Sequence, residues 1–371
     1  MPDARTGPVG IGVIGAGLIS STYLENLNRF PDTTVLAIGD IRPEVAQARA
    51  MEHDVPRGGD VATVLDHPVV EIVVNLTTPA AHVEVAEAAL AAGKHVWNEK
   101  PLALDRAGGA RLLARANGAR LRIGCAPDTF LGDGLQAARR ALDDGVIGRP
   151  LTALALFQNP GPDAWHPNPA FLFQVGAGPL FDLGPYYLTA LVQAFGPVSE
   201  VAAIGSTARA RRHIGSGPNA GQPFDVTAPS HVGALIRFAG GQSAQAIFSF
   251  DSAVHRTLLE INGTDGTMLA PDPNEFDGTV GVRRGGSGVT ETVATTTARS
   301  TRGTGVLDMA RAIRAGRPHR ADGTLAYHVL DVMAAITDSI EACAFVEVES
   351  RVERAEPLPE DWDPLASTLD P

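Results

Sequence analysis

The sequence predicts an α/β protein in which a doubly wound parallel sheet is followed by an α+β domain with a large, mainly antiparallel sheet. The chain has 371 residues, which is longer than a domain with a single hydrophobic core usually is, so two domains are expected. In the first third, short β-branched runs alternate with helical patterns, which is typical of parallel strands joined by helices. In the second half, the pattern is instead typical of antiparallel hairpins. We therefore predict domains over 1–125 and 126–350, and a surface tail over 351–371.

The first strand–helix–strand unit begins with Val9–Ile14, which is predicted as a buried strand because it is rich in β-branched residues. A glycine turn follows, then a helix over Leu18–Phe30 that ends before Pro31, then a strand over Val35–Ile38. The alternation continues with a helix after Pro43, strands over 69–76, 95–98 and 121–125, and helices over 80–92 and 105–117.

The second half has a different pattern. A helix is predicted over Leu135–Leu142 and a strand over Leu151–Gln158, followed by a loop rich in proline and glycine over 159–169. Two runs of alternating hydrophobicity surround Gly240-Gly241 and predict an antiparallel hairpin. The two runs are Val232–Phe238 and Ala244–Phe250.

A polar stretch over 207–229 is expected to be a surface excursion, because it is rich in glycine and proline. It contains the basic cluster Arg209, Arg211 and Arg212. Since exposed charges usually belong to solvated faces, we interpret this cluster as a solvated face.

Charge and cysteine content exclude several classes of protein. The formal net charge is −12, which disfavours a surface that neutralises nucleic-acid phosphates or an anionic membrane. The only cysteines, Cys125 and Cys343, lie far apart, so neither a disulfide framework nor a metal site is predicted. We find no leader peptide and no run of about 18 apolar residues. A soluble protein of the reducing cytoplasm, bound to neither nucleic acid nor membrane, is expected.

The segment from Gly15 to Ser20 predicts a dinucleotide site. It lies between a predicted strand and a predicted helix, where the pattern G-x-G-x-x-G lets backbone amides approach a pyrophosphate. Ser20 replaces the third glycine and is still small enough for close packing of helix and strand. A plain tight turn would also explain Gly15 and Gly17. Domain 1–125 is interpreted as an NAD(P)-binding Rossmann domain.

Asp40 favours NAD over NADP. It ends the second predicted strand, near the distance at which a carboxylate bonds the adenosine ribose hydroxyls. A carboxylate there repels a 2′-phosphate, whereas Arg42 could partner one, so NADP stays possible. The alternative role of Asp40 is that of a helix-capping acid before Pro43.

Motif residues also occur in two longer blocks, one in each predicted domain. Val74–Pro79, His82 and Ala92–Val96 lead to the tripeptide Glu99-Lys100-Pro101, and a second block covers Gly176–Tyr187. Together the blocks resemble the Gfo/Idh/MocA family of nicotinamide-dependent sugar and cyclitol oxidoreductases, over nearly the whole chain. In that family the tripeptide follows the fifth strand, and its lysine lies between nicotinamide and substrate. The resemblance and the glycine turn imply cofactor contacts from Gly15, Ala16, Gly17, Leu18, Ile19, Asp40, Arg42, Thr77, Thr78, Pro79, His82, Glu99 and Lys100.

Lys100 is the predicted proton-transfer residue. Oxidation of a secondary alcohol removes the hydroxyl proton as hydride leaves, so a polar group must lie within hydrogen-bond reach of that oxygen. Lys100 could relay the proton, or polarise a carbonyl in the reverse direction, more easily if burial lowers its pKa.

The second block departs from the family pattern at one position. Many members carry Asp-x-Gly-x-His, with the histidine as proposed acid/base and the aspartate in contact with substrate, but here Tyr186 follows Asp182 at the histidine position. A phenol with its ordinary pKa of about 10 is a poor base at neutral pH unless a cation such as Lys100 lowers it. We predict Tyr186 as a hydrogen-bonding partner in catalysis, together with Asp182. A half-buried aromatic and a helix N-cap are their alternative roles.

Four more residues are predicted to contact substrate. Trp165 and His166 lie in a loop ahead of the second block that could fold over a sugar, and loops often carry binding residues. Asp128 follows the sixth predicted strand, and Tyr187 ends the second block. His82 is also expected to cap or pack within the dinucleotide domain.

The predicted function is hydride transfer between nicotinamide and a secondary alcohol or ketone of a sugar, glycoside or cyclitol held between the domains. Two alternatives stay open: a redox-neutral glycosidase-type enzyme that recycles bound NAD, and a non-catalytic regulator that senses NAD(P) or a sugar. The second domain's sheet is the predicted oligomer surface, since an open sheet face needs covering and family relatives pair such sheets. A homodimer or homotetramer is expected.

Overall fold

The computed structural model describes residues 6–369 and divides into two compact units. Unit 1 runs to Leu131 and also includes Arg299–Tyr327 and the chain from Leu358 onward, while unit 2 comprises Gly132–Ala298 and His328–Pro357. The predicted domains were contiguous in sequence. The units are not, because two C-terminal segments return to the first one.

Unit 1 contains a six-stranded sheet in the order β3-β2-β1-β4-β5-β6, and every neighbouring pair is parallel. All six residues of β1 are buried, as expected for a central strand covered on both faces. This sheet confirms the predicted doubly wound fold. Its strands are β1 (Val9–Ile14), β2 (Thr33–Gly39), β3 (Gly58–Gly59), β4 (Ile72–Asn75), β5 (His95–Asn98) and β6 (Ile123–Cys125).

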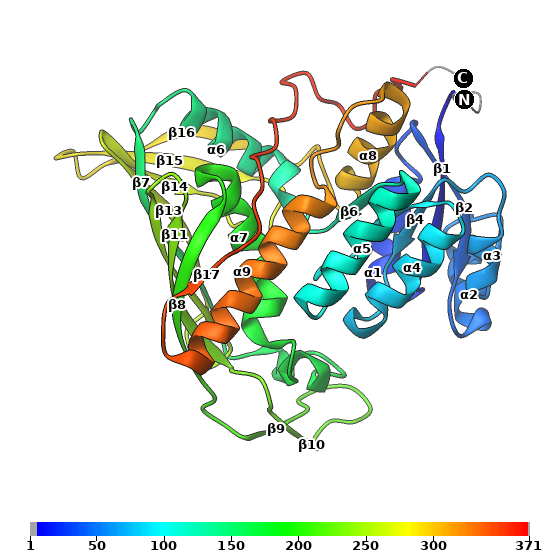
Figure 1. Ribbon diagram of the computed structural model, residues 1–371, viewed down its shortest axis with the longest axis horizontal. Helices are drawn as coiled ribbons and strands as arrows, with labels where there is room; N and C mark the ends of the chain where they lie inside the picture. Colours follow the sequence, from blue (N-terminus) through cyan, green and yellow to red (C-terminus); the bar gives the residue numbers. More distant parts are fainter. Residues whose placement is uncertain (1–5, 370–371) are drawn as a thin grey trace. The chain divides into compact units, whose positions relative to one another are not determined.

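Helices connect these strands, and Figure 1 shows α4 and α5 side by side. The predicted first helix ends at Leu27 rather than Phe30. The short elements β3 and α3 escaped prediction, since two or five residues carry little periodic signal. The helices of unit 1 are α1 (Leu18–Leu27), α2 (Pro43–Glu52), α3 (Val61–Leu65), α4 (His82–Ala91), α5 (Arg106–Ala119) and α8 (Thr304–Ala315).

Unit 2 contains a nine-stranded sheet in the order β16-β15-β14-β13-β7-β12-β11-β8-β17. All its neighbours are antiparallel except β12 and β7. The large, mainly antiparallel sheet is therefore confirmed. Its strands are β7 (Pro150–Gln158), β8 (Val198–Ser206), β11 (His231–Phe238), β12 (Ser243–Ser249), β13 (Arg256–Gly263), β14 (Gly266–Ala270), β15 (Gly278–Arg284), β16 (Thr290–Thr296) and β17 (Val346–Glu347).

One face of this sheet is covered by α7 (Gly178–Phe195), and α9 (Gly323–Ala342) runs along β8 (Figure 1). The burial pattern follows the pleat: Val232, Ala234 and Ile236 of β11 are buried, whereas Leu235 between them is 50% exposed. A third helix, α6 (Asp133–Asp143), packs on β15 and β16. Within residues 6–369, none of the helices is both long and apolar enough to cross a membrane.

The basic excursion is not solvated throughout. Arg212, in β9 (Arg211–His213), is 3% exposed, and its guanidinium lies 2.6 Å from a carboxylate oxygen of Asp163 and of Asp251. It also covers the ring of Phe173 at 4.9 Å. The interpretation of the whole cluster as a solvated face was wrong for Arg212, because this residue ties the β9–β10 hairpin (β10, Pro223–Asp225) to the loop before α7.

The C-terminal tail is bound rather than loosely draped. Arg311 of α8 pairs with Asp32 at 2.7 Å, and both side chains are buried. The ring of Trp362 stacks over the Arg311 guanidinium at 4.4 Å, and the amide of Thr368 donates to Asp32 at 2.9 Å. The tail therefore completes a buried ion pair of unit 1.

Candidate functional site

The glycine turn after β1 has one glycine that the fold requires and one that it does not. Gly15 has φ +104°, and a Cβ there would lie 2.7 Å from the backbone of Leu76. Gly17 has φ −70°, and a Cβ there would have no atom within 4 Å beyond the glycine itself and its two chain neighbours. The open space faces the start of α1, where backbone amides attract phosphate. These residues fit the pyrophosphate of a dinucleotide.

Asp40 is oriented by the glycine turn. Its Oδ2 accepts a hydrogen bond from the amide of Ala16 at 2.8 Å, and its Oδ1 accepts one from the amide of Arg42 at 2.9 Å. The N-cap of α2 is Arg42, so Asp40 does not cap that helix. The carboxylate stands at the carboxyl end of β2, as the ribose contact requires, with the largely exposed Arg42 side chain beside it.

Two large apolar side chains stand uncovered at the same edge. Leu18, at the start of α1, is 90% exposed, and Ile41, which follows Asp40, is 89% exposed. Such side chains beside an open glycine turn are what a bound dinucleotide would cover. They add to the evidence that this edge holds the cofactor.

His82 links the two loops that follow β4 and β5. Its ring is 1% exposed, with Nδ1 2.7 Å from the carbonyl oxygen of Pro101 and Nε2 3.1 Å from that of Thr77. Burial lowers the pKa of His82, which favours the neutral imidazole. Because the ring is buried against protein, the predicted direct contact of His82 with the cofactor is corrected. The other predicted role of His82, packing within the dinucleotide domain, agrees with these contacts. Thr77 and Pro79 are half-buried and Thr78 is exposed.

Glu99 and Lys100 follow the carboxyl end of β5. Glu99 is 8% exposed, and its Oε2 accepts a hydrogen bond from the amide of Lys100 at 3.1 Å. Lys100 itself is half-buried. Because all strands of unit 1 are parallel, this pair, the glycine turn, Asp40 and the Thr77 loop share one edge of the sheet.

The sequence contains only two lysines, Lys94 and Lys100, and arginine makes up the rest of the 30 lysine and arginine residues. Lys94 is buried, and its Nζ donates to the carbonyl oxygens of His67 and Val70. Surface positive charge in this chain is thus supplied by arginine, and Lys100 is the lysine that stands at the sheet edge after β5.

Asp128 does not occupy the predicted substrate-facing position. It is fully buried, and its Oδ2 accepts hydrogen bonds from the amides of Gly303 at 2.8 Å and Gly305 at 3.0 Å. Burial raises the pKa of this carboxyl. The prediction of a substrate contact is corrected: Asp128 anchors the amino end of α8, a long-range contact that local sequence does not reveal.

The second motif forms the start of α7 in unit 2. The helix begins at Gly178 with Ala177 as N-cap, so Asp182 is not a helix cap. Asp182 and Tyr186 are four residues apart and share one face of the helix. Asp182 is half-buried and Tyr186 is 6% exposed.

Tyr187 points in a different direction, into the core of unit 2. It has no exposed surface, its ring packs edge-on against Phe157 and Phe248, and its hydroxyl donates to Asp272 at 3.3 Å. Burial raises the pKa of Tyr187. The predicted substrate contact is corrected, because adjacent helix residues point in different directions and only one of this pair can join Asp182.

Trp165 and His166 lie together in the loop before α7. Trp165 is 66% exposed, and the two rings meet edge-on with centroids 5.5 Å apart. His166 Nδ1 accepts a hydrogen bond from the amide of Asn168 at 3.0 Å, and its ring also contacts that of Phe171. These aromatic side chains form an exposed platform on unit 2.

Two family models match the chain. One, described as an oxidoreductase family with an NAD-binding Rossmann fold, covers residues 9–125. The other, described as a GFO/IDH/MocA C-terminal domain, covers residues 135–269. Together they take in the six-stranded sheet of unit 1, strands β7 to β13 of unit 2, and most of the chain.

Named relatives agree with these models. Inositol 2-dehydrogenase of Ralstonia nicotianae is 33% identical over 40% of this chain, an alignment that spans only 46% of that relative. Trans-1,2-dihydrobenzene-1,2-diol dehydrogenase of Bos taurus is 26% identical over 71% of this chain and 74% of its own.

Among solved structures, a levoglucosan dehydrogenase in complex with NADH and L-sorbose superposes with a TM-score of 0.80. It is 21% identical, and the match covers 92% of this chain and 99% of the other, which shows a shared fold. The glycine turn, the Glu-Lys-Pro edge and both domain matches lead to one assignment: the chain belongs to the Gfo/Idh/MocA family of NAD-binding oxidoreductases.

Proposed function

We propose that this protein transfers hydride between nicotinamide and a secondary alcohol or ketone of a sugar, glycoside or cyclitol, with Lys100 assisting proton transfer. The observation that carries the proposal is Lys100 itself, one of two lysines, fixed through its amide by buried Glu99 at the cofactor edge. The names of the relatives support a ring-borne secondary alcohol as substrate.

The residues of this chain would divide the work as follows. The glycine turn binds the pyrophosphate, and Asp40 accepts hydrogen bonds from the adenosine ribose. When bound, NAD supplies the acceptor for hydride. Lys100 takes the hydroxyl proton during oxidation, or holds a proton against the carbonyl oxygen during reduction. Asp182 and Tyr186 would hydrogen-bond substrate, and Trp165 and His166 would contact the face of the sugar ring.

An assay across inositols, pyranoses and glycosides, with NAD⁺ and with NADP⁺, tests the proposal through formation of the reduced cofactor. We expect reduced cofactor with at least one cyclic polyol and a preference for NAD⁺ because of Asp40. Lys100→Met should lower kcat at least about 100-fold while NADH affinity stays within about twofold, since proton transfer supplies a factor of that order. Lys94→Met is the control at the other lysine.

The outcomes separate the alternatives. Unchanged turnover in Lys100→Met would refute the proton-transfer role. Turnover of a glycoside without release of reduced cofactor would instead support the redox-neutral enzyme, in which oxidation and reduction cancel. Cofactor and sugar binding without any turnover would support the regulator, for which the tyrosine in place of the family histidine is the motivating feature.

We also propose that two copies of this chain pair through the uncovered face of the nine-stranded sheet. Strand register aligns two rows of residues across five strands, which we call the outer rows. The first is Ile204, Gly233, Ile247, Leu156 and Leu258, and the second is Ala202, Leu235, Gln245, Leu154 and Glu260.

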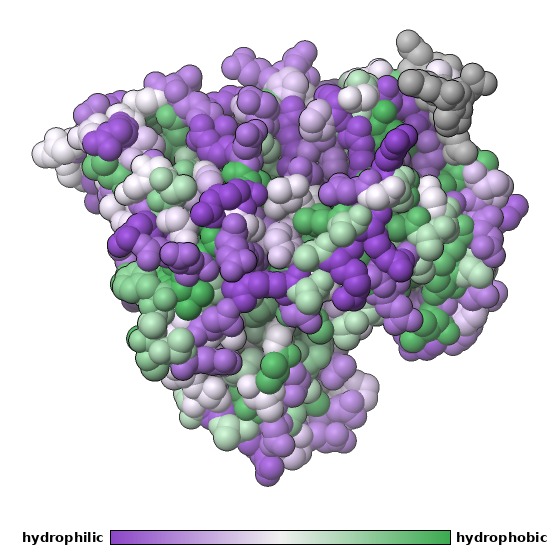
Figure 2. Space-filling model, viewed as in Figure 1, coloured by the Kyte–Doolittle hydropathy of each residue, from purple (hydrophilic) through white to green (hydrophobic). Residues whose placement is uncertain are grey.

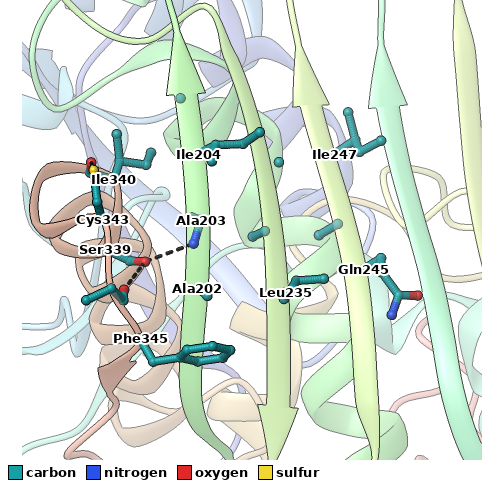
Figure 3. A pocket seen from close by; sticks show the side chains of 15 residues that line it. Ala202, Ala203, Ile204, Leu235, Gln245, Ile247, Ser339, Ile340, Cys343 and Phe345 are labelled. Carbon is teal, nitrogen blue, oxygen red and sulfur yellow. Dashed lines mark hydrogen bonds between the residues drawn. The ribbon is translucent and has the colours of Figure 1, made fainter.

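Apart from Gln245 and Glu260, the outer rows consist of apolar residues and glycine, and all of their residues are at least partly exposed. Ile204 is 73% exposed, and together with Phe345, which is 58% exposed, it lines a depression of about 650 Å³ (Figure 3). Figure 2 shows hydrophobic atoms gathered at the margin where Figure 1 draws β8 and β17. The next row along the pleat is polar and contains the paired Glu200 and Arg237. An apolar centre with a rim of both charges suits a second copy of the same face.

Light scattering coupled to size-exclusion chromatography tests this pairing. We expect wild type to elute as a dimer or tetramer, and Leu235→Glu to dissociate, because a carboxylate would be buried at the centre of the contact. Val293→Glu changes an exposed apolar residue outside the outer rows and should not alter the mass. A wild-type monomer at micromolar concentration would refute the pairing.

A further inference from the structure

The carboxylate of Glu99 is held inside unit 1 by donors from the core. Its Oε1 accepts a hydrogen bond from the hydroxyl of Tyr23 at 2.8 Å, and that hydroxyl in turn accepts one from Trp97 Nε1 at 3.2 Å. Tyr23 and Trp97 have no exposed surface. With the amide of Lys100 on Oε2, a continuous path runs from the buried core to the backbone of Lys100.

A nearby positive charge stabilises a buried carboxylate, and Arg302, far along the chain from Glu99, supplies one. Its Nη1 lies 4.0 Å from Glu99 Oε1, and the two side chains are 17% and 11% exposed. At that degree of burial the attraction is screened much less than at the surface. The same neighbourhood includes Lys100, since the buried groups His82 and Cys125 both experience the charges of Glu99 and Lys100.

The backbone on both sides of the Arg302 side chain is held by hydrogen bonds. Its carbonyl oxygen accepts a hydrogen bond from Asn26 Nδ2 of α1 at 2.8 Å. The next residue, Gly303, donates to Asp128, and so does Gly305. Gly305 lies so close to Trp97 that a Cβ would stand 2.0 Å from its ring. The backbone that carries Arg302 is therefore held next to the Glu99 site, and Arg302 lies outside both ranges matched by the family models.

We propose that Arg302 is a positioning residue for the reaction, acting on Lys100 through the carboxylate of Glu99. Arg302 balances the charge of Glu99, and Glu99 then holds the peptide that carries Lys100. The proposal depends on the proposed role of Lys100. The proposal also explains the buried position of Asp128, because its hydrogen bonds to Gly303 and Gly305 hold the segment that contains Arg302.

The two-lysine sequence permits a test that needs no substrate. Labelling with lysine that carries ¹⁵N at Nζ gives two side-chain signals, and the one lost in Lys100→Met belongs to Lys100. We expect Arg302→Met to raise the pKa of Lys100, because a positive charge nearby is removed and Glu99 is left unbalanced. Arg302→Lys should return it toward the wild-type value. The exposed Arg299, changed to Met, is the matched control and should cause no shift.

A double-mutant cycle then tests the path through Glu99. If Arg302 acts through Glu99, adding Arg302→Met to Glu99→Gln should change the Lys100 pKa much less than it does in wild type. With any substrate that the wild-type enzyme turns over, Arg302→Met should lower kcat about tenfold or more, while NADH affinity stays within about twofold. The reason is that misplacement of a reacting group by about 1 Å can lower the rate about 100-fold. Its pH–rate profile should move to higher pH.

The failure of this inference is distinct from that of the proposed function. An inactive Lys100→Met beside an Arg302→Met with wild-type kcat, pH profile and Lys100 pKa would overturn the inference alone. An active Lys100→Met would overturn the function, and the NMR titration would still decide the coupling. If Arg302→Met does not fold, Arg302→Gln replaces it, and an unshifted Lys100 signal in that variant refutes the proposal.

Discussion

At the residue scale, the glycine turn separates what the protein needs from what its ligand needs. Gly15 adopts a backbone conformation that side chains rarely tolerate and packs directly on the β4 loop. Gly17 is in an ordinary extended conformation with open space around it. The fold therefore makes no demand for glycine at this position, whereas close approach of a ligand to the backbone does.

Substitutions at the two glycines should therefore affect different properties, cofactor binding at Gly17 and stability at Gly15. Gly17→Val should leave the melting temperature of the cofactor-free protein unchanged but weaken NADH binding at least about tenfold, or roughly 1.4 kcal/mol. Gly15→Ala should lower the melting temperature, because the positive φ is strained and the Cβ meets the backbone of Leu76. Calorimetric titration and thermal unfolding measure the two effects. Tight NADH binding by Gly17→Val would contradict the assignment of this space to the pyrophosphate.

Sequence reasoning predicts which residues local chain order brings to one edge of the sheet, but it does not reveal which residues are buried by distant partners. The glycine turn, Asp40 and Lys100 each follow the end of a strand, and parallel topology alone brings them to one edge. Asp128 and Tyr187 looked similar in sequence. Their partners, Gly303 and Asp272, are far along the chain, and no local pattern could exclude burial.

At the scale of elements, α9 is shared between the two units, since its residues through Tyr327 belong to unit 1 and those from His328 to unit 2. His328 is fully buried. Its Nε2 accepts a hydrogen bond from the amide of Val198 at 3.0 Å, and its Nδ1 lies 2.8 Å from Ser350 Oγ. An accepting Nε2 must be unprotonated, so this contact at the start of β8 requires the neutral ring.

This requirement predicts an acid-sensitive fold. Burial lowers the pKa of His328 to about 4, with Asp331 opposing the shift and Arg351 adding to it. Because the unfolded chain keeps a pKa of about 6.5, it binds more protons between these values, and the free energy of unfolding falls as the pH drops from about 6.5 to about 4. The loss from this group approaches about 3 kcal/mol.

Urea unfolding at a series of pH values measures the effect. His328→Gln should be less stable than wild type at neutral pH but should lose less stability on acidification. His213→Gln changes an exposed histidine and should keep the wild-type slope. His95 and His319 of unit 1 share a pKa of about 4 through burial, so part of the acid sensitivity should persist in the variant. An unaltered slope in His328→Gln would show that this histidine is not responsible.

Element prediction succeeded where periodicity extends over several turns or strand residues. The strands of unit 1 and the hairpin of β11 and β12 have buried faces that their sequences display. The β9–β10 hairpin has no such face. Its position depends on the buried pairs of Arg212, which appear in sequence as one more arginine among several.

At the scale of the whole molecule, unit 1 is assembled from three separate stretches of sequence. The helix α8 and the tail meet around Arg311, whose Nη2 donates to the carbonyl oxygens of Asp363 and Ala366. The predicted contiguous domains could not include this, because nothing in the tail's composition distinguishes a bound segment from a free one.

Removing the charge at Arg311 should therefore destabilise the protein. Arg311→Met leaves Asp32 buried without its cation, which typically costs about 3 kcal/mol or more. Arg29→Met, at an exposed arginine close to Asp32 in sequence, should change stability by less than about 0.5 kcal/mol. Equilibrium urea unfolding provides the comparison. Equal midpoints for Arg311→Met and wild type would mean that the tail and its ion pair contribute nothing.

The return of the chain to unit 1 has a consequence during synthesis. The outer edge of β6 is closed by residues around Ala321, whose carbonyl oxygen accepts from the amide of Cys125 at 3.1 Å. Until that stretch leaves the ribosome, after nearly the whole of unit 2, the nascent sheet keeps an open strand edge that invites pairing with other chains. The domain that comes first in the sequence is thus among the last to be finished.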